Sequence, residues 1–441
     1  MTSKLELDDI QSGALRPRPA PFAATYVALR MDDRQAGREL MLRLSEVVSA
    51  ASDPGGPEKE TWVSAALTVH GLRALGVAEA SLETFPLPFR QGMAARAGIL
   101  GDTGESAPQH WEKPLGSNEV HVVLTAVSTD AAKLEASVAR AREAYREKTA
   151  IVPVWRQDCG VQVGEKEPFG YRDGVSHPAI EGSGIPGTNP HEAPLKAGEF
   201  VLGYPDEIDD APIIPQPAEL SRNGSFIVFR KLHQRVAAFR RYLRENATES
   251  MPEELLAAKL MGRWRSGAPL ALSPTKDDAE LGSDSSRNNA FQFQADDPIG
   301  YRTPKGSHIR RMNPRDADIS GVARIHRMIR RGSGYGPPLP QGVMDDDGAD
   351  RGLMFAFVGA HLVRQFEFVQ SEWMNDGAFF GGSSEKDPVS GAADGKGTFD
   401  VPRRPLRLRL QGLSRFVVTR GGEYGFMPGL NALRWLGTLE G

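Results

Sequence analysis

Stretches that favour strands and amphipathic helices alternate along the first 155 residues, and this order constrains the fold more than any other feature. The β-branched and aromatic residues that favour strands are enriched in 24–30, 62–68, 121–127 and 151–155. A helix is predicted after the first strand, with Asp32 and Asp33 as N-cap candidates, and a second helix after the third strand, with apolar residues at helical spacing: Leu134, Val138, Ala141 and Tyr145. The order strand-helix-strand-strand-helix-strand predicts a ferredoxin-like domain with helices on one face of an antiparallel sheet.

A similar succession follows in the second half of the chain. Strands are predicted at 225–230, 353–358 and 416–419, with a helix after the first and another at about 362–373. The Pro-rich run at 211–217 predicts a boundary between two α+β domains, 1–217 and 218–441. Pro153 places the last strand of the first domain near a sheet edge. The Gly-, Ser- and Asp-rich stretch 381–397 predicts a long exposed loop.

Composition excludes several classes of protein. The net charge of -4 on 441 residues favours binding to neither nucleic acid nor an anionic membrane. No apolar run approaches the roughly 18 residues that a membrane helix needs, and we expect no secretory or twin-arginine leader. Cys159 is the single cysteine, so intrachain disulfides and cysteine-based zinc or iron-sulfur sites are excluded. These features predict a reduced, cytoplasmic protein.

Two polar segments carry the chemistry that the sequence suggests. His308 lies in a Pro-punctuated basic segment, with Arg330 and Arg331 a short distance downstream. A neutral imidazole is the usual proximal ligand of haem iron, and guanidinium groups can hold propionates or stabilise developing negative charge. Asp173 lies between Gly170 and Gly174 in a Gly-x-x-Asp-Gly core, where its carboxylate could act as an acid-base group. Each residue also has a structural alternative, a solvated histidine, an Asx-type turn or a surface cation.

Taken together, several separated blocks resemble the dye-decolourising peroxidases, in particular their longer-chain subgroup. The blocks are the Gly-x-x-Asp-Gly core at 170–174, His-x-Arg-x-x-Asn-Pro-Arg at 308–315, and the segments 329–336, 364–370 and 420–426, with further likeness at 7–11 and 89–96. They occur in order over nearly the whole chain. The resemblance implies a pair of ferredoxin-like domains with haem b between or beside them.

The resemblance also implies a role for each matched residue. His308 falls on the proximal haem ligand, which binds the iron, and Asp173 on the distal acid-base residue. Arg330 falls on the distal arginine, although its neighbour Arg331 remains a competitor. Further cofactor contacts are implied at the last residue of the histidine block and at two residues lining the apolar distal side: Arg315, Leu353 and Phe355.

The chain departs from the family pattern at two places. Many relatives carry an acidic residue where this chain has Gly359-Ala-His361, so the partner of the His308 imidazole is left without a candidate. Gly332 stands where some relatives carry a distal Asn. His177 and His326 are expected to be hydrogen-bonded or exposed histidines and not ligands. The acidic run 345–350 is expected to be a solvated loop, with Mn(II) binding as the alternative.

We therefore expect a haem peroxidase that reduces hydrogen peroxide and oxidises dyes, phenols or other aromatic donors, with dye oxidation favoured at acidic pH. Bulky donors could pass electrons through surface Tyr or Trp residues, and the sequence does not identify which ones. A haem carrier or iron-release protein with incidental peroxidase activity is one alternative, and a haem-free ferredoxin-like binding module is another. The number of subunits stays open, and a homo-oligomer is compatible with the sequence.

Overall fold

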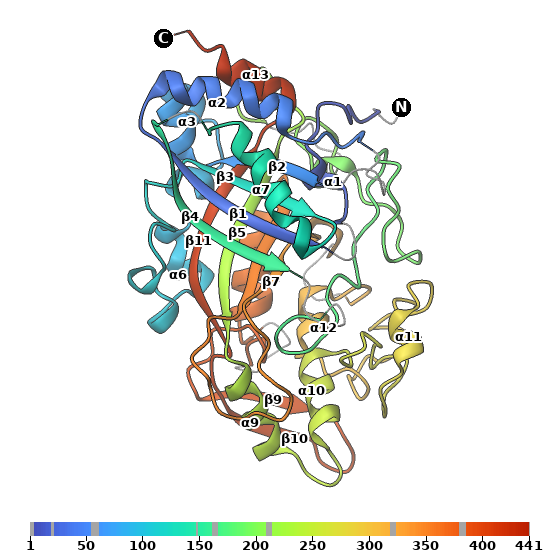
Figure 1. Ribbon diagram of the computed structural model, residues 1–441. Helices are drawn as coiled ribbons and strands as arrows, with labels where there is room; N and C mark the ends of the chain where they lie inside the picture. The colour runs from blue at the N-terminus through green and yellow to red at the C-terminus, as the bar shows by residue number, and fades with distance from the viewer. Residues whose placement is uncertain are drawn as a thin grey trace.

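A computed structural model describes residues 4–18, 22–53, 61–146, 149–160, 166–208, 214–317, 323–378 and 385–440. Within these ranges one antiparallel sheet of nine strands forms the centre of the molecule, in the order β4-β1-β3-β2-β11-β5-β8-β6, with β7 also paired to β8 (Figure 1). Its strands are β1 (Ala23–Met31), β2 (Thr61–Leu67), β3 (Val122–Ser128), β4 (Ile151–Gly160), β5 (Ser225–Gln234), β6 (Ile329–Arg330), β7 (Ser333–Tyr335), β8 (Gly352–Gly359) and β11 (Val417–Met427). A separate hairpin joins β9 (Gly397–Val401) to β10 (Leu408–Leu413).

Helices cover the sheet and its ends. The longer ones are α2 (Arg34–Val47), α3 (Val69–Leu75), α7 (Leu134–Glu143), α9 (Val236–Asn246), α10 (Glu253–Met261) and α13 (Leu430–Gly437). Short α-helical turns are α1 (Ser12–Leu15), α4 (Glu79–Leu82), α5 (Leu87–Gln91), α6 (Ala97–Leu100), α8 (Ala218–Ser221), α11 (Ala279–Ser283) and α12 (His308–Met312). Two π-helical segments, η7 (Val363–Glu367) and η8 (Val369–Asn375), occupy the stretch predicted as an ordinary helix. No helix in the described part of the chain is both long and apolar enough to cross a bilayer.

The predicted succession of the first half is confirmed. Asp33 caps α2, since its carboxylate accepts a hydrogen bond of 2.7 Å from the Ala36 N–H. Strand β4 lies at the end of the sheet, as Pro153 indicated, and α7 packs against β3 and β2. In Figure 1, α2 and α13 lie together at one end of the sheet, although they come from opposite ends of the sequence.

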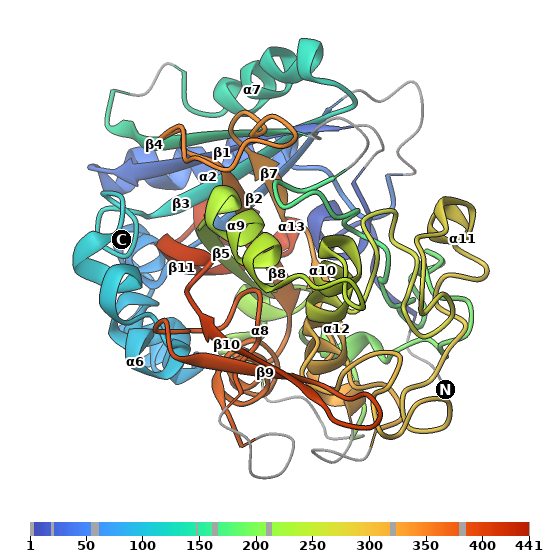
Figure 2. The same ribbon diagram turned by 90° about the horizontal axis from the view of Figure 1, so that it is seen from below.

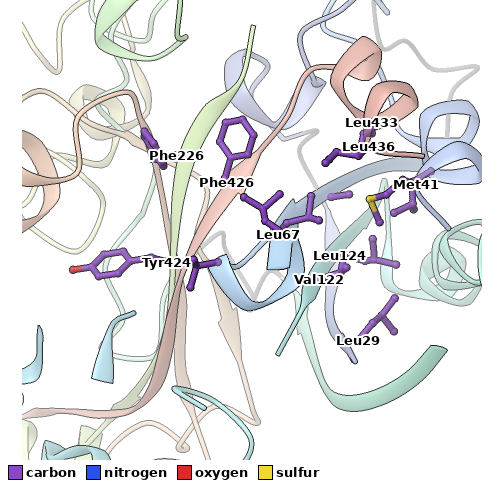
Figure 3. Close-up of a cluster of buried hydrophobic side chains, with 14 of the residues drawn as sticks. Leu29, Met41, Leu67, Val122, Leu124, Phe226, Tyr424, Phe426, Leu433 and Leu436 are labelled. Atoms are coloured by element: carbon purple, nitrogen blue, oxygen red, sulfur yellow. The ribbon is translucent and has the colours of Figure 1, made fainter. Parts of the chain in front are cut away.

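The two predicted domains meet within the sheet. Strands β1 to β4 come from residues before 217 and the other strands of the sheet from residues after it, and β11 touches β2 at the pair Phe426 and Leu67. Figure 3 shows Phe226, Tyr424 and Phe426 on this central part of the sheet, with Leu67 close by. The α+β class is confirmed, whereas the boundary at 217 stays a prediction.

The prediction of an exposed loop at 381–397 is wrong for part of this stretch. Residues 381–384 lie outside the described residues, but Asp387 is only 1% exposed and Val389 is also buried. The Asp387 carboxylate accepts hydrogen bonds from the N–H groups of Val389 and Ser390, at 3.0 and 2.8 Å. A turn that satisfies its own polar groups in this way can be buried despite its polar composition.

Candidate active site

A cavity of about 310 Å³ lies beside β5 and β8 and the short helix α12. Residues from both halves of the chain line it. Every residue to which the sequence gave a site role is among them: Asp173, His308, Arg315, Arg330, Leu353 and Phe355. The structure thus brings together side chains that the sequence placed far apart.

Asp173 lies in a loop whose backbone requires the flanking glycines. Gly170 and Gly174 have φ angles of 96° and 76°, in the left-handed region that glycine tolerates best. The Asp173 Oδ1 atom accepts a hydrogen bond of 2.7 Å from the Gly174 N–H and lies 4.0 Å from Nη1 of Arg330. Although the loop is deep in the molecule, the side chain is 42% exposed because it faces the cavity.

The pKa of Asp173 lies below its ordinary value. Burial opposes ionisation and is the largest single influence, but the positive charges of Arg330 and Arg18, the Gly174 N–H and the neighbouring His177 together outweigh it. The carboxylate therefore stays ionised at pH values where an ordinary aspartate would begin to take up a proton. An ionised carboxylate is the form that can accept a proton from a bound substrate.

The structure separates Arg330 from its competitor Arg331. Arg330 ends β6, lines the cavity and pairs with Asp173. Arg331 is directed elsewhere, since its Nη2 donates a hydrogen bond of 2.8 Å to the Leu15 carbonyl oxygen, and burial lowers its pKa to about 9. Of the two cations, Arg330 is the one placed beside the Asp173 carboxylate.

His308 is the first residue of α12 and has a buried carboxylate as its partner. Its Nδ1 lies 2.8 Å from Oδ2 of Asp387, and the Ser390 hydroxyl lies 3.4 Å from the same nitrogen. Burial disfavours the charged form of Asp387, but His308 and the Ser390 N–H outweigh this effect, so the pKa of Asp387 is lowered. The Asp387 carboxylate accepts a hydrogen bond from the Nδ1–H group, and Nε2 of His308 has no hydrogen-bond partner among the described residues.

Sequence reasoning missed Asp387. By resemblance, the acidic partner of His308 was expected near Gly359-Ala-His361, where this chain has none. The stretch 381–397, which contains Asp387, was expected to be exposed to solvent. The Asp-Pro-Val-Ser order at 387–390 is typical of an Asx turn and could have indicated an ordered segment, but not its contact with His308.

Part of the cavity wall is apolar. Along β8, Leu353 and Phe355 face the cavity, whereas the alternate residues Met354 and Ala356 are buried on the other side of the strand. This alternation is the two-residue period of a strand. An apolar wall excludes water and strengthens electrostatic interactions inside the cavity.

Arg315 borders the cavity but is held by the protein. It has a φ of 58°, its Nη1 donates to the carbonyl oxygens of Asn289 and Phe291 at 3.0 and 2.8 Å, and its guanidinium stacks 3.8 Å from the Phe291 ring. Arg263 donates to the same Asn289 side chain that accepts from Arg315. Burial lowers the pKa of Arg315 to about 10 and that of Arg263 to about 9, but both stay cationic at neutral pH. Two cations at the edge of one cavity, Arg263 buried and Arg315 half-buried, suit an anionic ligand group.

The other candidate ligands are two histidines and the acidic run 345–350. Burial, together with Arg331 and Arg330, lowers the pKa of His177 to about 3, and its Nδ1 is buried without a hydrogen-bond partner among the described residues, so this ring is not the hydrogen-bonded or exposed histidine that the sequence predicted. His326 stacks on Phe368 at 3.9 Å, and its Nδ1 contacts the Arg364 carbonyl oxygen, as expected for a hydrogen-bonded histidine. No group of three or more potential metal ligands from His, Cys, Asp and Glu occurs in the described ranges, and 345–350 is largely exposed.

The residues present fit a haem group. Asp387 leaves Nε2 of His308 available to coordinate iron on the cavity side, and arginines at the cavity edge can bind propionates. An ionised Asp173 and Arg330 lie on the same cavity, against an apolar wall. An antiparallel α+β fold with this donor set defines a protein of the haem peroxidase class.

Comparison with known proteins identifies the family. No family model matches the chain. Peroxidase 2 of Mycetinis scorodonius is 31% identical to it over 426 residues, covering 90% of this chain and 79% of that protein. A dye-decolorizing peroxidase of Exidia glandulosa is 30% identical over 455 residues, covering 98% and 87%. A solved dye-decolorizing peroxidase in complex with 2,6-dimethoxyphenol matches with a TM-score of 0.85 and 26% identity, over 98% of this chain and 100% of that one.

The chain belongs to the dye-decolourising peroxidase family, and it is an enzyme, a peroxidase. The resemblance stated from the sequence is therefore confirmed, and a peroxidase is favoured over a haem carrier or a haem-free module. Dye-decolourising peroxidases are haem enzymes. The expected cytoplasmic location stays a prediction, and the number of subunits stays open.

Proposed function

We propose that this protein binds haem b in the cavity between His308 and Asp173, reduces hydrogen peroxide and oxidises dyes and phenolic donors. The observation that carries the proposal is that Asp173, Arg330 and His308 all line one cavity. The relative bound to 2,6-dimethoxyphenol supports aromatic compounds as donors. When bound, haem supplies the redox-active iron that delivers electrons to peroxide.

On one side of the cavity, His308 is the proposed iron ligand through Nε2. Asp387 fixes the ring by accepting a hydrogen bond from Nδ1–H, and it makes the imidazole a stronger electron donor. The turn at 387–390 holds the carboxylate in place through the N–H groups of Val389 and Ser390. The ligand is therefore preorganised before the cofactor binds.

On the other side, Asp173 is the proposed acid-base residue. Its ionised carboxylate accepts a proton from one oxygen of hydrogen peroxide and returns it to the other oxygen, which leaves as water. Arg330, 4.0 Å from that carboxylate, stabilises the negative charge that develops as the O–O bond breaks. Leu353 and Phe355 keep this side apolar, and Arg315 is proposed to bind a propionate.

Two substitutions test the two proposed roles separately, one at the iron ligand His308 and one at the acid-base residue Asp173. His308→Ala should purify without the Soret absorption of bound haem, because the iron loses its only proposed protein ligand. Asp173→Asn should keep the Soret band but lose about 10²- to 10⁴-fold in kcat/KM for hydrogen peroxide, the usual contribution of a positioned acid-base group. Absorption spectra and steady-state kinetics measure both effects.

His110→Ala is the matched control, since His110 is exposed and lies outside the cavity lining. It should bind haem and turn over peroxide as the wild type does. A His308→Ala protein with an unchanged Soret band, or an Asp173→Asn protein with wild-type kcat/KM, would contradict the assigned roles.

A further inference from the structure

A surface patch at the turn between β9 and β10 combines exposed apolar, aromatic and cationic side chains. The turn meets the segment that leads into α12, and its tip lies beside the loops of that region in Figure 2. Its apolar members are Leu406, Ile299 and Tyr301, which are 76%, 54% and 39% exposed. Together with Arg403 and Arg404 they form what we call the Tyr301 patch.

The two arginines are ordered by neutral partners. The Arg404 guanidinium carbon lies 5.9 Å from the centre of the Tyr301 ring, and its Nε is 3.4 Å from the phenol oxygen. Arg403 donates to the Leu406 carbonyl oxygen at 3.3 Å and to the Ser250 hydroxyl at 3.4 Å. These contacts hold both side chains at the turn, and neither guanidinium forms an ion pair with a described carboxylate.

The positive charge of the patch is not neutralised by the protein. Arg403, Arg404 and the flanking Arg302 and Lys305 form no ion pair with a carboxylate in the described ranges. The nearby carboxylate of Asp400 is already paired with Arg407 and Arg409, at 3.4 and 2.8 Å. On a chain whose net charge is -4, Arg403 and Arg404 therefore carry positive charge that no carboxylate within ion-pair distance offsets in the described ranges.

We propose that the Tyr301 patch binds small anionic aromatic molecules, such as aryl sulfonates or aryl carboxylates. A guanidinium group recognises a sulfonate or carboxylate in its own plane and also stacks on an aromatic ring. The exposed Tyr301 ring offers a flat apolar surface for the ligand ring, and Arg403 and Arg404 offer donors for the anion. Neither an uncharged ring nor an inorganic anion would use both parts of the patch.

The patch is joined to the active site through one buried lysine. Lys259, on α10, donates from Nζ to the carbonyl oxygens of Tyr301 and Arg302 at 2.9 and 2.6 Å. Its own carbonyl oxygen accepts a hydrogen bond of 2.6 Å from the hydroxyl of Ser307, the residue before His308. The floor of the patch and the proposed iron ligand thus belong to one ordered segment, so a donor bound here would lie on the His308 side of the molecule.

Binding is tested without turnover, on the purified full-length protein. Naphthalene-2-sulfonate is the probe, and its neutral isostere naphthalene-2-sulfonamide and inorganic sulfate are the comparison ligands. Arg403→Gln with Arg404→Gln should weaken binding of the sulfonate about tenfold, as expected for the loss of two exposed cationic contacts. The sulfonamide and sulfate should bind more weakly to the wild type than the sulfonate does, at equal ionic strength.

The matched control is Arg34→Gln with Arg43→Gln, which removes the same charge from the exposed face of α2, at the other end of the molecule (Figure 1). It should bind the sulfonate as the wild type does. Equal binding by the Arg403 and Arg404 double variant, equally tight binding of the sulfonamide, or equally tight binding of sulfate would each overturn the proposal. Equally tight binding of the sulfonamide would mean that the patch is a simple apolar surface. Equally tight binding of sulfate would mean that it is a simple anion site.

A kinetic measurement extends the inference to donors and rests on the proposed function. With a sulfonated aromatic donor, the double variant should show a raised KM and an unchanged kcat, whereas kinetics with an uncharged phenol should not change. If the protein lacked peroxidase turnover, the binding measurement would still show whether the Tyr301 patch binds the sulfonate. Unchanged KM for the sulfonated donor would exclude the patch from the oxidation reaction.

Discussion

At the scale of single residues, the charge balance around Asp173 decides the pH range of the proposed chemistry. Burial alone would favour the protonated acid, and the arginines around the carboxylate reverse that preference. Arg18 is useful for a test because it acts on Asp173 through its charge, while its guanidinium donates to the Ser333 hydroxyl at 2.5 Å.

Arg18→Gln should shift the acid limb of the kcat/KM profile for hydrogen peroxide to higher pH. Removing the positive charge raises the pKa of Asp173, so the carboxylate becomes protonated, and inactive as a base, at a higher pH than in the wild type. The profile is measured between about pH 2.5 and 7. The remote variant Arg43→Gln should leave it unchanged, and a shift to lower pH would refute Asp173 as the titrating group.

The contact between Asp387 and His308 leads to a second prediction at this scale. Asp387→Asn should make the reduction potential of the bound haem more positive, because a neutral amide leaves the imidazole a weaker donor to the oxidised iron. Spectroelectrochemical titration measures the potential. Ser390→Ala, which leaves the Asp387 carboxylate in place, should shift the reduction potential less. An unchanged potential in Asp387→Asn would show that Asp387 does not tune the iron through His308.

At the scale of elements, the join between β2 and β11 is where the two halves of the sheet meet. It is supported by a group of aromatic rings rather than by a long ladder of pairs. Phe426 lies 5.3 Å from Phe85 and 5.9 Å from Phe226 between ring centres, and Phe85 stacks on Phe89 at 4.9 Å. Burial of these rings supplies stability that the single strand pair cannot.

Phe426→Ala should lower the free energy of unfolding by about 3–5 kcal/mol, the usual cost of a large cavity in a core. Denaturant unfolding followed by circular dichroism measures the change. Leu87→Ala, at an exposed position on α5, should change the stability by no more than about 0.5 kcal/mol. A loss below about 1 kcal/mol at Phe426 would mean that the join does not depend on this cluster.

At the scale of the whole molecule, a buried carboxyl group links folding to pH. Glu423 on β11 accepts a hydrogen bond of 2.6 Å from the Gly116 N–H, which ties the segment before β3 to the sheet. Burial raises the pKa of Glu423 from an ordinary 4.5 to about 8. Because the folded state retains the proton and the unfolded state releases it, stability is lost as pH rises from about 4.5 to about 8.

Glu423→Gln should remove this loss. The amide oxygen can accept the same hydrogen bond from Gly116, but it has no charge to bury, so the variant should exceed the wild type in stability at pH 8 by a few kcal/mol and match it near pH 4. Urea unfolding at the two pH values measures the difference. Glu83→Gln, on the surface, should have the stability of the wild type at both pH values. A Glu423→Gln variant that is less stable than the wild type at pH 8 would refute the claim that Glu423 keeps its proton in the folded state.

The amino-acid sequence by itself determined where most strands and helices lie, and it supplied the candidate site residues. Periodicity, capping and turn residues act over a few positions, so β1, α2 and the glycine-flanked Asp173 are encoded locally. The tertiary structure alone decided which partners meet. His308 and Asp387 are 79 positions apart, Arg330 and not Arg331 faces Asp173, and Tyr301 meets Arg404 on a separate hairpin. Such contacts depend on how elements pack, and no local pattern of residues specifies that packing.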